Sequence, residues 1–113
     1  MAFPTVEFAA SFRGLGHLEG GMPAYSVPWD ISARGAIVVG ESQSANGREA
    51  YRWSADTGMV ALGSLGGADF FSTAWRISTE GLVIAGASRS PSSGTRTEAF
   101  RWTAELGMIG MGD

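Results

Sequence analysis

Short apolar segments separated by glycine-containing turns make up most of this chain. Residues 37–40 are rich in β-branched side chains, which are enriched in strands. Residues 49–53 alternate along the chain, which places the aromatic side chains on one face and alanine and arginine on the other. No window carries apolar residues at helical spacing over three turns. The pattern therefore predicts an all-β protein without helices.

The same pattern occurs twice. Residues 22–44 align without a gap with residues 68–90, and residues 49–63 align with residues 98–112. Sixteen of these 38 aligned positions are identical, and the second copy has three extra residues in one loop. A repeat of this length usually corresponds to one supersecondary unit that buries its apolar faces against further copies. The chain is therefore predicted to contain two copies of one small β-unit.

Each copy contains four segments with strand character. They are residues 24–32, 37–40, 49–53 and 59–63 in the first copy and residues 70–78, 83–86, 98–102 and 108–112 in the second. Four antiparallel strands in 46 to 49 residues match the size of one β-propeller blade. Val38 and Val39 are adjacent and point to opposite faces of their strand, so both faces of the sheet need cover. We therefore expect two four-stranded propeller blades in the chain.

This interpretation divides the chain into a partial repeat, residues 1–21, and two blades, residues 22–67 and 68–113. Within the partial repeat, residues 12–16 are expected to form the outer strand of an incomplete blade, and residues 15–21 are expected to form the glycine-rich link to the next blade. Known propellers close with about four to eight blades, so two blades alone expose apolar faces and strand edges. We therefore expect a homo-oligomer of two to four chains that closes a propeller. A monomeric two-blade fragment and a compact β-sandwich of the two sheets are the alternatives.

Composition narrows the classes of function. The 113 residues carry a net charge of −3 and their eight basic residues are scattered arginines, so nucleic acid is not an expected partner. The chain has no cysteine, and neither a metal nor a cofactor is expected. The longest apolar run, residues 36–39, is too short to span a membrane. The N-terminus does not resemble a signal peptide, so the expressed chain is expected to be soluble and cytoplasmic.

The repeated motifs resemble a known family. They read SVPWDISARG at residues 26–35, STAWRISTEG at residues 72–81, LGSLGG at residues 62–67 and EAFRWT at residues 98–103. This pattern resembles the HAF repeat, which occurs in tandem arrays in probable extracellular bacterial proteins. The resemblance covers residues 12–112. It implies a propeller-like fold and an extracellular or cell-surface location, and it implies no established activity.

Residues that recur at equivalent positions are expected to be structural. They are Glu49, Arg52 and Trp53 in the first copy and Glu98, Arg101 and Trp102 in the second. The glutamate and the arginine face opposite sides of their strand, so they do not pair within it. Arg52 is therefore expected to bond Glu98 or a carbonyl group of the neighbouring blade, which would fix the registry between blades.

Two further tryptophans, Trp29 and Trp75, also occupy equivalent positions. Like Trp53 and Trp102, they are expected to pack between the blades. If their ring faces were open to solvent, they would instead form a platform on which a sugar could stack. Asp69, which also differs between the copies, is then a further candidate ligand contact.

Three residues that break the repeat are candidate catalytic groups. His17 is the only histidine, Asp30 has Arg76 as its counterpart, and Glu41 has Ala87. Copies of these groups brought together around an oligomer axis would offer general acid–base chemistry. The sequence thus favours a non-enzymatic binding or interaction module for glycans or small polar ligands. The alternative is an ester or phosphoester hydrolase with its site at the tunnel mouth or the oligomer axis.

Overall fold

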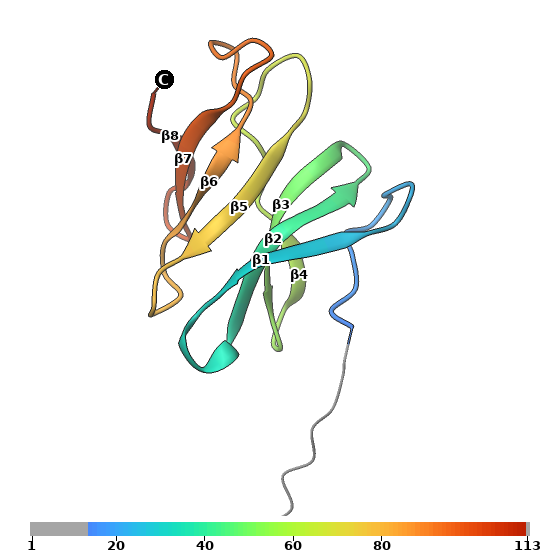
Figure 1. The fold of residues 1–113 in the computed structure, drawn as a ribbon, viewed down its shortest axis with the longest axis vertical. Coiled ribbons are helices and arrows are strands. Elements are labelled where there is room, and N and C mark those ends of the chain that lie inside the picture. Colours follow the sequence, from blue (N-terminus) through green and yellow to red (C-terminus); the bar gives the residue numbers. More distant parts are fainter. Residues whose placement is uncertain (1–13, 113) are drawn as a thin grey trace, which may run out of the picture.

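Residues 14–112 are described by the computed structural model, and they form two antiparallel sheets of four strands each. Sheet 1 consists of β1 (Ser26–Ile31), β2 (Ile37–Ser44), β3 (Gly47–Ser54) and β4 (Gly58–Ala61). Sheet 2 consists of β5 (Ser72–Ile77), β6 (Ile84–Ser88), β7 (Glu98–Thr103) and β8 (Gly107–Gly110). Strands adjacent in the sequence are adjacent in each sheet (Figure 1). The predicted all-β class and the two four-stranded antiparallel sheets are confirmed.

The two sheets share one strand register, as their sequence repeat requires. In sheet 1 Val38 pairs with Ile31 and with Trp53, and in sheet 2 its counterpart Ile84 pairs with Ile77 and with Trp102. Each position that is paired in both sheets thus has equivalent partners in the two. Equivalent positions can therefore be compared directly, and differences between them report on their surroundings.

Several boundaries differ from those expected. β2 and β3 are longer than predicted because Gly47, at φ 133°, lets the chain reverse through a two-residue turn at Ala45 and Asn46. The three extra residues of the second copy lie in the corresponding loop, and β6 ends earlier, at Ser88. The turn predicted before β2 forms a short 3-10 helix, η1 (Ala33–Gly35).

The partial repeat differs more. The outer strand expected at residues 12–16 is absent over residues 14–16, which belong to neither sheet, while residues 12 and 13 lie outside the described part of the chain. Leu15 and Leu18 of this segment nevertheless pack on sheet 1. They occupy the positions that Leu62 and Leu65 occupy against the core between the sheets. Residues 15–18 therefore pack as the expected glycine-rich link, and residues 14–16 do not form the expected strand.

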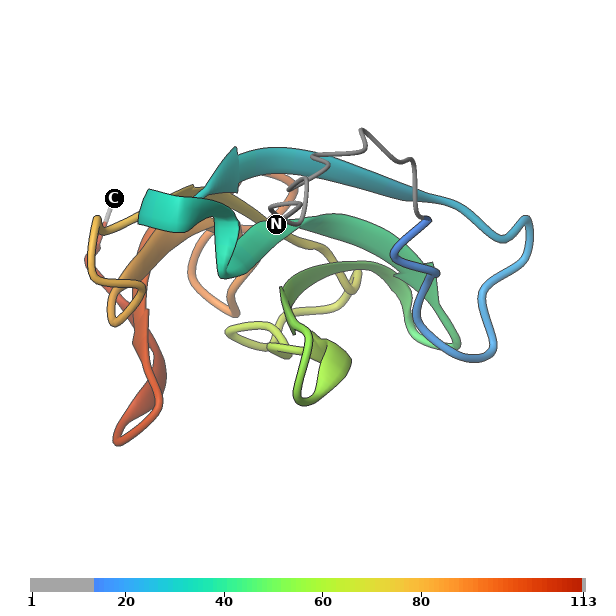
Figure 2. The same cartoon turned by 90° about the horizontal axis from the view of Figure 1, so that it is seen from below.

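The sheets spread apart like a partly opened fan (Figure 2). The edge strands β1 and β5 lie side by side, whereas β4 and β8 diverge. We call β1 and β5 the inner strands for this reason. The arrangement of a single chain is open and does not close into a ring.

Apolar side chains fill the space between the two sheets. Val39 and Ala50 from sheet 1 pack with Ala74, Ile84 and Phe100 from sheet 2, and all five are fully buried. We call this cluster the junction core. We call the face of sheet 1 that carries Val39 and Ala50 its back, and the face of sheet 2 that carries Ala74, Ile84 and Phe100 its front. The junction core joins these two different faces and so fixes how the second repeat packs on the first.

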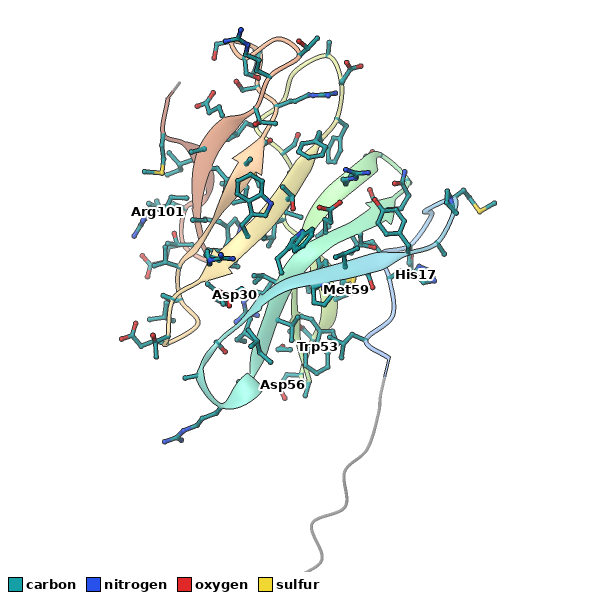
Figure 3. The ribbon with its side chains drawn as sticks, in the orientation of Figure 1. His17, Asp30, Trp53, Asp56, Met59 and Arg101 are labelled. Carbon is teal, nitrogen blue, oxygen red and sulfur yellow. The ribbon has the colours of Figure 1, made fainter. Side chains whose placement is uncertain are left out.

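A second cluster covers the opposite face of sheet 1. Leu18, Val38 and Tyr51 are buried there, with Trp53 and Met59 packed against them (Figure 3). Burial raises the pKa of Tyr51 to about 12, so its phenol stays neutral. Val38 and Val39 thus contact different clusters on opposite faces, as expected for a sheet that needs cover on both sides. No helix in the described residues has the length and apolarity needed to cross a bilayer.

Candidate functional site

The inner strands carry one exposed tryptophan each. The pairing of β1 with β2 skips Trp29, and the pairing of β5 with β6 skips Trp75, so both residues lie at a β-bulge. A bulge leaves its extra residue unpaired and redirects the side chain. Each of the two tryptophans is 49 % exposed. The expectation that all four tryptophans pack between the sheets is therefore wrong for Trp29 and Trp75.

Glu41 fixes the position of the Trp29 ring. The Nε1–H of Trp29 donates to Oε1 of Glu41 at 3.0 Å, and the hydroxyl of Thr73 on β5 donates to the same oxygen at 3.0 Å. Arg48 forms an ion pair with Oε2 at 2.9 Å. Glu41 is a buried carboxylate, and these contacts supply the partners that such a group needs. It therefore links both sheets and has both oxygens engaged.

Asp30 makes the second polar contact between the sheets. Its Oδ2 accepts a hydrogen bond from the backbone N–H of Ile77 on β5, and its Oδ1 accepts one from the N–H of Ile31, both at 2.9 Å. The bond from Ile77 is the main reason why the pKa of Asp30 lies below its usual value, and the bond from Ile31 and the charge of Arg76 act in the same direction against partial desolvation. The carboxylate is thus held ionised as a structural acceptor.

The lowered pKa predicts a pH dependence of stability. An aspartate whose pKa is lower in the folded than in the unfolded chain stabilises the fold fully above about pH 4, and this contribution disappears as the pH falls through the folded pKa. Asp30→Asn should therefore destabilise the protein at neutral pH, and the difference from the wild type should narrow below about pH 4. Urea unfolding at several pH values measures it. A difference that does not vary with pH would show that Asp30 is not linked to folding in this way.

His17 and Asp69 lie away from this region. His17 is exposed on the link before β1, and its Nδ1–H donates to the carbonyl of Leu18 at 2.9 Å. Figure 3 shows His17 and Asp30 near opposite ends of β1. Asp69 is largely exposed and pairs with Arg89 at 3.5 Å. Within the described part of one chain, His17, Asp30 and Glu41 do not form a common site, and no cluster of three potential metal ligands occurs.

Sequence reasoning missed an aromatic–cation group at one end of the inner strands. The guanidinium groups of Arg48 and Arg89 lie 5.7 and 5.6 Å from the centre of the Phe71 ring, within the range of cation–π contacts. Arg48 also donates from Nε to the hydroxyl of Tyr25 at 3.0 Å. A signal existed, because Arg48 and Arg89 have uncharged counterparts in the other copy. Only the fold brings these residues together.

The repeated glutamates attach the links to the sheets. Glu49 accepts a hydrogen bond from the hydroxyl of Ser44 at 2.7 Å and one from the N–H of Gly63 at 3.1 Å. Glu98 makes the equivalent bonds with Ser90 and Gly112, at 2.7 and 3.2 Å. Each carboxylate thus bonds within its own repeat, where it joins a hairpin to the start of the following link.

The repeated arginines do not make the expected contact. Arg52 forms no hydrogen bond or ion pair with Glu98, whose carboxylate is occupied as described above. Arg101 lies exposed on the outer side of sheet 2 (Figure 3). Trp53 and Trp102 are half-buried, and each packs against a core cluster. Asp30 and Glu41, which are not repeated, contact the other sheet instead.

Comparisons of the chain with models of known families, with curated proteins and with solved structures find no match. The chemical features of the inner strands are therefore the basis for assigning a function. These features are the bulges at Trp29 and Trp75, their half-exposed indoles, and the carboxylates of Asp30 and, on the adjacent β2, Glu41, each of which bonds to the other sheet through one oxygen.

Proposed function

We propose that this chain is a non-enzymatic binding module built from two propeller blades of the HAF-repeat type, which self-associates in rings of two to four copies. Its ligand is a glycan or a small polar molecule that stacks on Trp29 and Trp75. The pair of half-exposed indoles at equivalent bulges is the observation that supports this function. The family resemblance adds an extracellular or cell-surface location to the proposal.

The two indoles suit a ligand with alternating apolar and polar surfaces. An indole offers a flat apolar face and one N–H donor, which matches the C–H face and the hydroxyl groups of a sugar ring. Trp29 is held in place by its bond to Glu41, so binding costs little side-chain entropy there. In sheet 2 the position equivalent to Glu41 is Ala87, which cannot accept a hydrogen bond from the indole of Trp75. The N–H of Trp75 is therefore available to a ligand.

A hydrolase is the less favoured alternative. General acid–base catalysis needs a carboxyl group that can exchange protons with a substrate. The oxygens of Asp30 and Glu41 instead accept hydrogen bonds from both sheets, and His17 lies elsewhere on the chain. These engagements support a structural role for both carboxylates.

The test is glycan binding by the wild type and by Trp75→Ala. After an array identifies a bound glycan, titration should show at least about a tenfold loss of affinity for the variant, since one stacking contact is removed. Because Trp75 is half-exposed, its unfolding midpoint should change little. Leu106→Ala, an exposed substitution on the β7–β8 turn, is the control and should bind normally. Equal affinity of the Trp75 variant, or chelator-sensitive turnover of esters or phosphoesters, would contradict the proposal.

A further inference from the structure

The back of sheet 1 is buried, whereas equivalent positions on the back of sheet 2 are exposed. Val39 and Ala50 on the back of sheet 1 are fully buried in the junction core. Their counterparts on the back of sheet 2, Ala85 and Ala99, are exposed. We call this the open back of sheet 2. It has the strand register of a covered face, but Ala85 and Ala99 lack the cover, although Ala87 beside them is buried.

The front of sheet 1 shows the complementary difference. Ala74 is fully buried in the junction core, whereas its counterpart Pro28 is exposed. Ile77 is half-buried against that core, whereas its counterpart Ile31 is 55 % exposed. Pro28 and Ile31 line an apolar depression of about 440 Å³, the open front of sheet 1. Pro28 and Ile31 are the counterparts of the residues through which sheet 2 packs on sheet 1, but no sheet packs on them in the single chain.

We propose that the open back of sheet 2 binds the open front of sheet 1 of a second copy of this chain, in the geometry by which sheet 1 holds sheet 2. The inference rests on the proposed self-association and specifies its interface. Three pairs of positions support it, because each pair either is retained or changes in both partners together.

The first pair is the buried hydrogen bond between Thr73 and Glu41. At the proposed junction the equivalent positions are Val27 of the second copy and Ala87. Neither residue carries a polar group, so no buried donor or acceptor is left unpaired. Loss of both partners of a buried hydrogen bond is nearly neutral, whereas loss of one is costly. The two substitutions are therefore compatible only when they occur together.

The second pair involves the backbone. The N–H of Ala50 donates to the hydroxyl of Ser72 at 2.9 Å across the internal junction. The equivalent positions are the N–H of Ala99 and the hydroxyl of Ser26 of the second copy. A backbone donor cannot be substituted away, and here the serine that accepts its bond is retained. The proposed junction therefore keeps an acceptor for this backbone N–H.

The third pair carries charge. At the internal junction the positive charge of Arg76 lies close enough to lower the pKa of Asp30. Arg76 is the counterpart of Asp30 in the repeat, so the proposed junction places Arg76 of one copy near Asp30 of the next. One aspartate and one arginine thus occupy these two positions at both junctions, with their order reversed. Charge complementarity of this kind favours one partner and one register.

The interface joins two different faces, so it is heterologous. Such contacts form rings if their rotation closes and filaments if it does not. A face-to-itself dimer would bring together two copies of the open front or two of the open back. It would not place Val27 at Ala87, Ser26 at Ala99 or Asp30 at Arg76. The complementary pairs therefore favour head-to-tail association.

The test uses one blocking variant for each face. Ala99→Glu puts a charge on the open back, and Ile31→Glu puts one on the open front; both positions are exposed in the single chain, so the fold is kept. Ile109→Glu is the control, because Ile109 is 46 % exposed and its counterpart Val60 remains 44 % exposed beside a filled junction. Light scattering after size exclusion gives the mass, and circular dichroism checks folding.

The wild type and Ile109→Glu should both have the mass of an assembly of two to four chains, each chain being 11.8 kDa. Each blocking variant alone should have the mass of one chain, with its dissociation constant raised at least about tenfold. A mixture of the two blocking variants should give a 1:1 complex and nothing larger, because only one open front and one open back remain.

Other outcomes overturn the inference in distinguishable ways. A wild type that stays monomeric at all concentrations contradicts the proposed self-association as well. Association of the wild type that only one variant abolishes indicates a face-to-itself dimer, and association that neither variant weakens places the interface elsewhere.

Discussion

Phe100→Ala is expected to lower the free energy of unfolding by about 3–5 kcal/mol, the usual cost of emptying a buried aromatic site. Phe100 is fully buried in the junction core, where it contacts residues of both sheets. The loss includes the transfer of the ring to water and the cavity left between the sheets, which the rigid strands around it fill only in part. Urea denaturation followed by tryptophan fluorescence measures the change.

The control for this prediction is Leu82→Ala, an exposed substitution in the loop between β5 and β6, which should change the free energy of unfolding by less than about 0.5 kcal/mol. Phe100→Leu should lie between the two, because it keeps most of the apolar volume. If Phe100→Ala and Leu82→Ala had the same midpoint, the two sheets would not be packed on one another through this side chain.

Repetition made most of the fold predictable from the sequence. Two aligned copies of one pattern gave two sets of four strands, and the glycines at the turns marked the breaks between them. The adjacent residues Val38 and Val39 predicted a sheet covered on both faces, and the structure buries both. Strand ends were less predictable, because they depend on which residues pair across the sheet.

The bulges could not be predicted because they are a property of pairing. Nothing in the sequence around Trp29 or Trp75 shows that one residue is skipped in the register between the inner strand and its neighbour. Without the bulge, regular alternation would decide which face each indole takes. With it, both tryptophans become half-exposed, which changes them from expected core residues into the candidate binding residues.

The contacts between the sheets were assigned to the wrong class of residue. Repeated residues such as Glu98 were expected to join the blades, but a repeated residue faces the same local surroundings in each copy and is suited to contacts within its own repeat. The junction between two particular sheets occurs once in the chain. Two of its side-chain contacts are made by residues that occur once, Asp30 and Glu41, while the bond from the N–H of Ala50 uses the repeated Ser72.

Gly86→Ala is expected to be destabilising by about 3 kcal/mol, the upper part of the range for overpacking a core. Gly86 pairs with Ala74 directly before the bulge, where β5 and β6 approach closely. A methyl group at Gly86 would overlap the carbonyl oxygen of Thr73 and would lie 2.9 Å from the ring of Phe100. The backbone atom cannot move without breaking the ladder, so the strands must separate.

The matched control for this glycine is Gly14→Ala, which has open space around the added methyl group and should shift the unfolding midpoint very little. Gly40→Ala tests the same idea in sheet 1, because a methyl group there would overlap the carbonyl oxygen of Val27 next to the other bulge. Both buried variants should therefore be destabilised by similar amounts. If Gly86→Ala and Gly40→Ala unfolded at the same urea concentration as Gly14→Ala, β1 would not lie close to β2 nor β5 to β6 at these glycines, and the bulges that expose the two tryptophans would be contradicted.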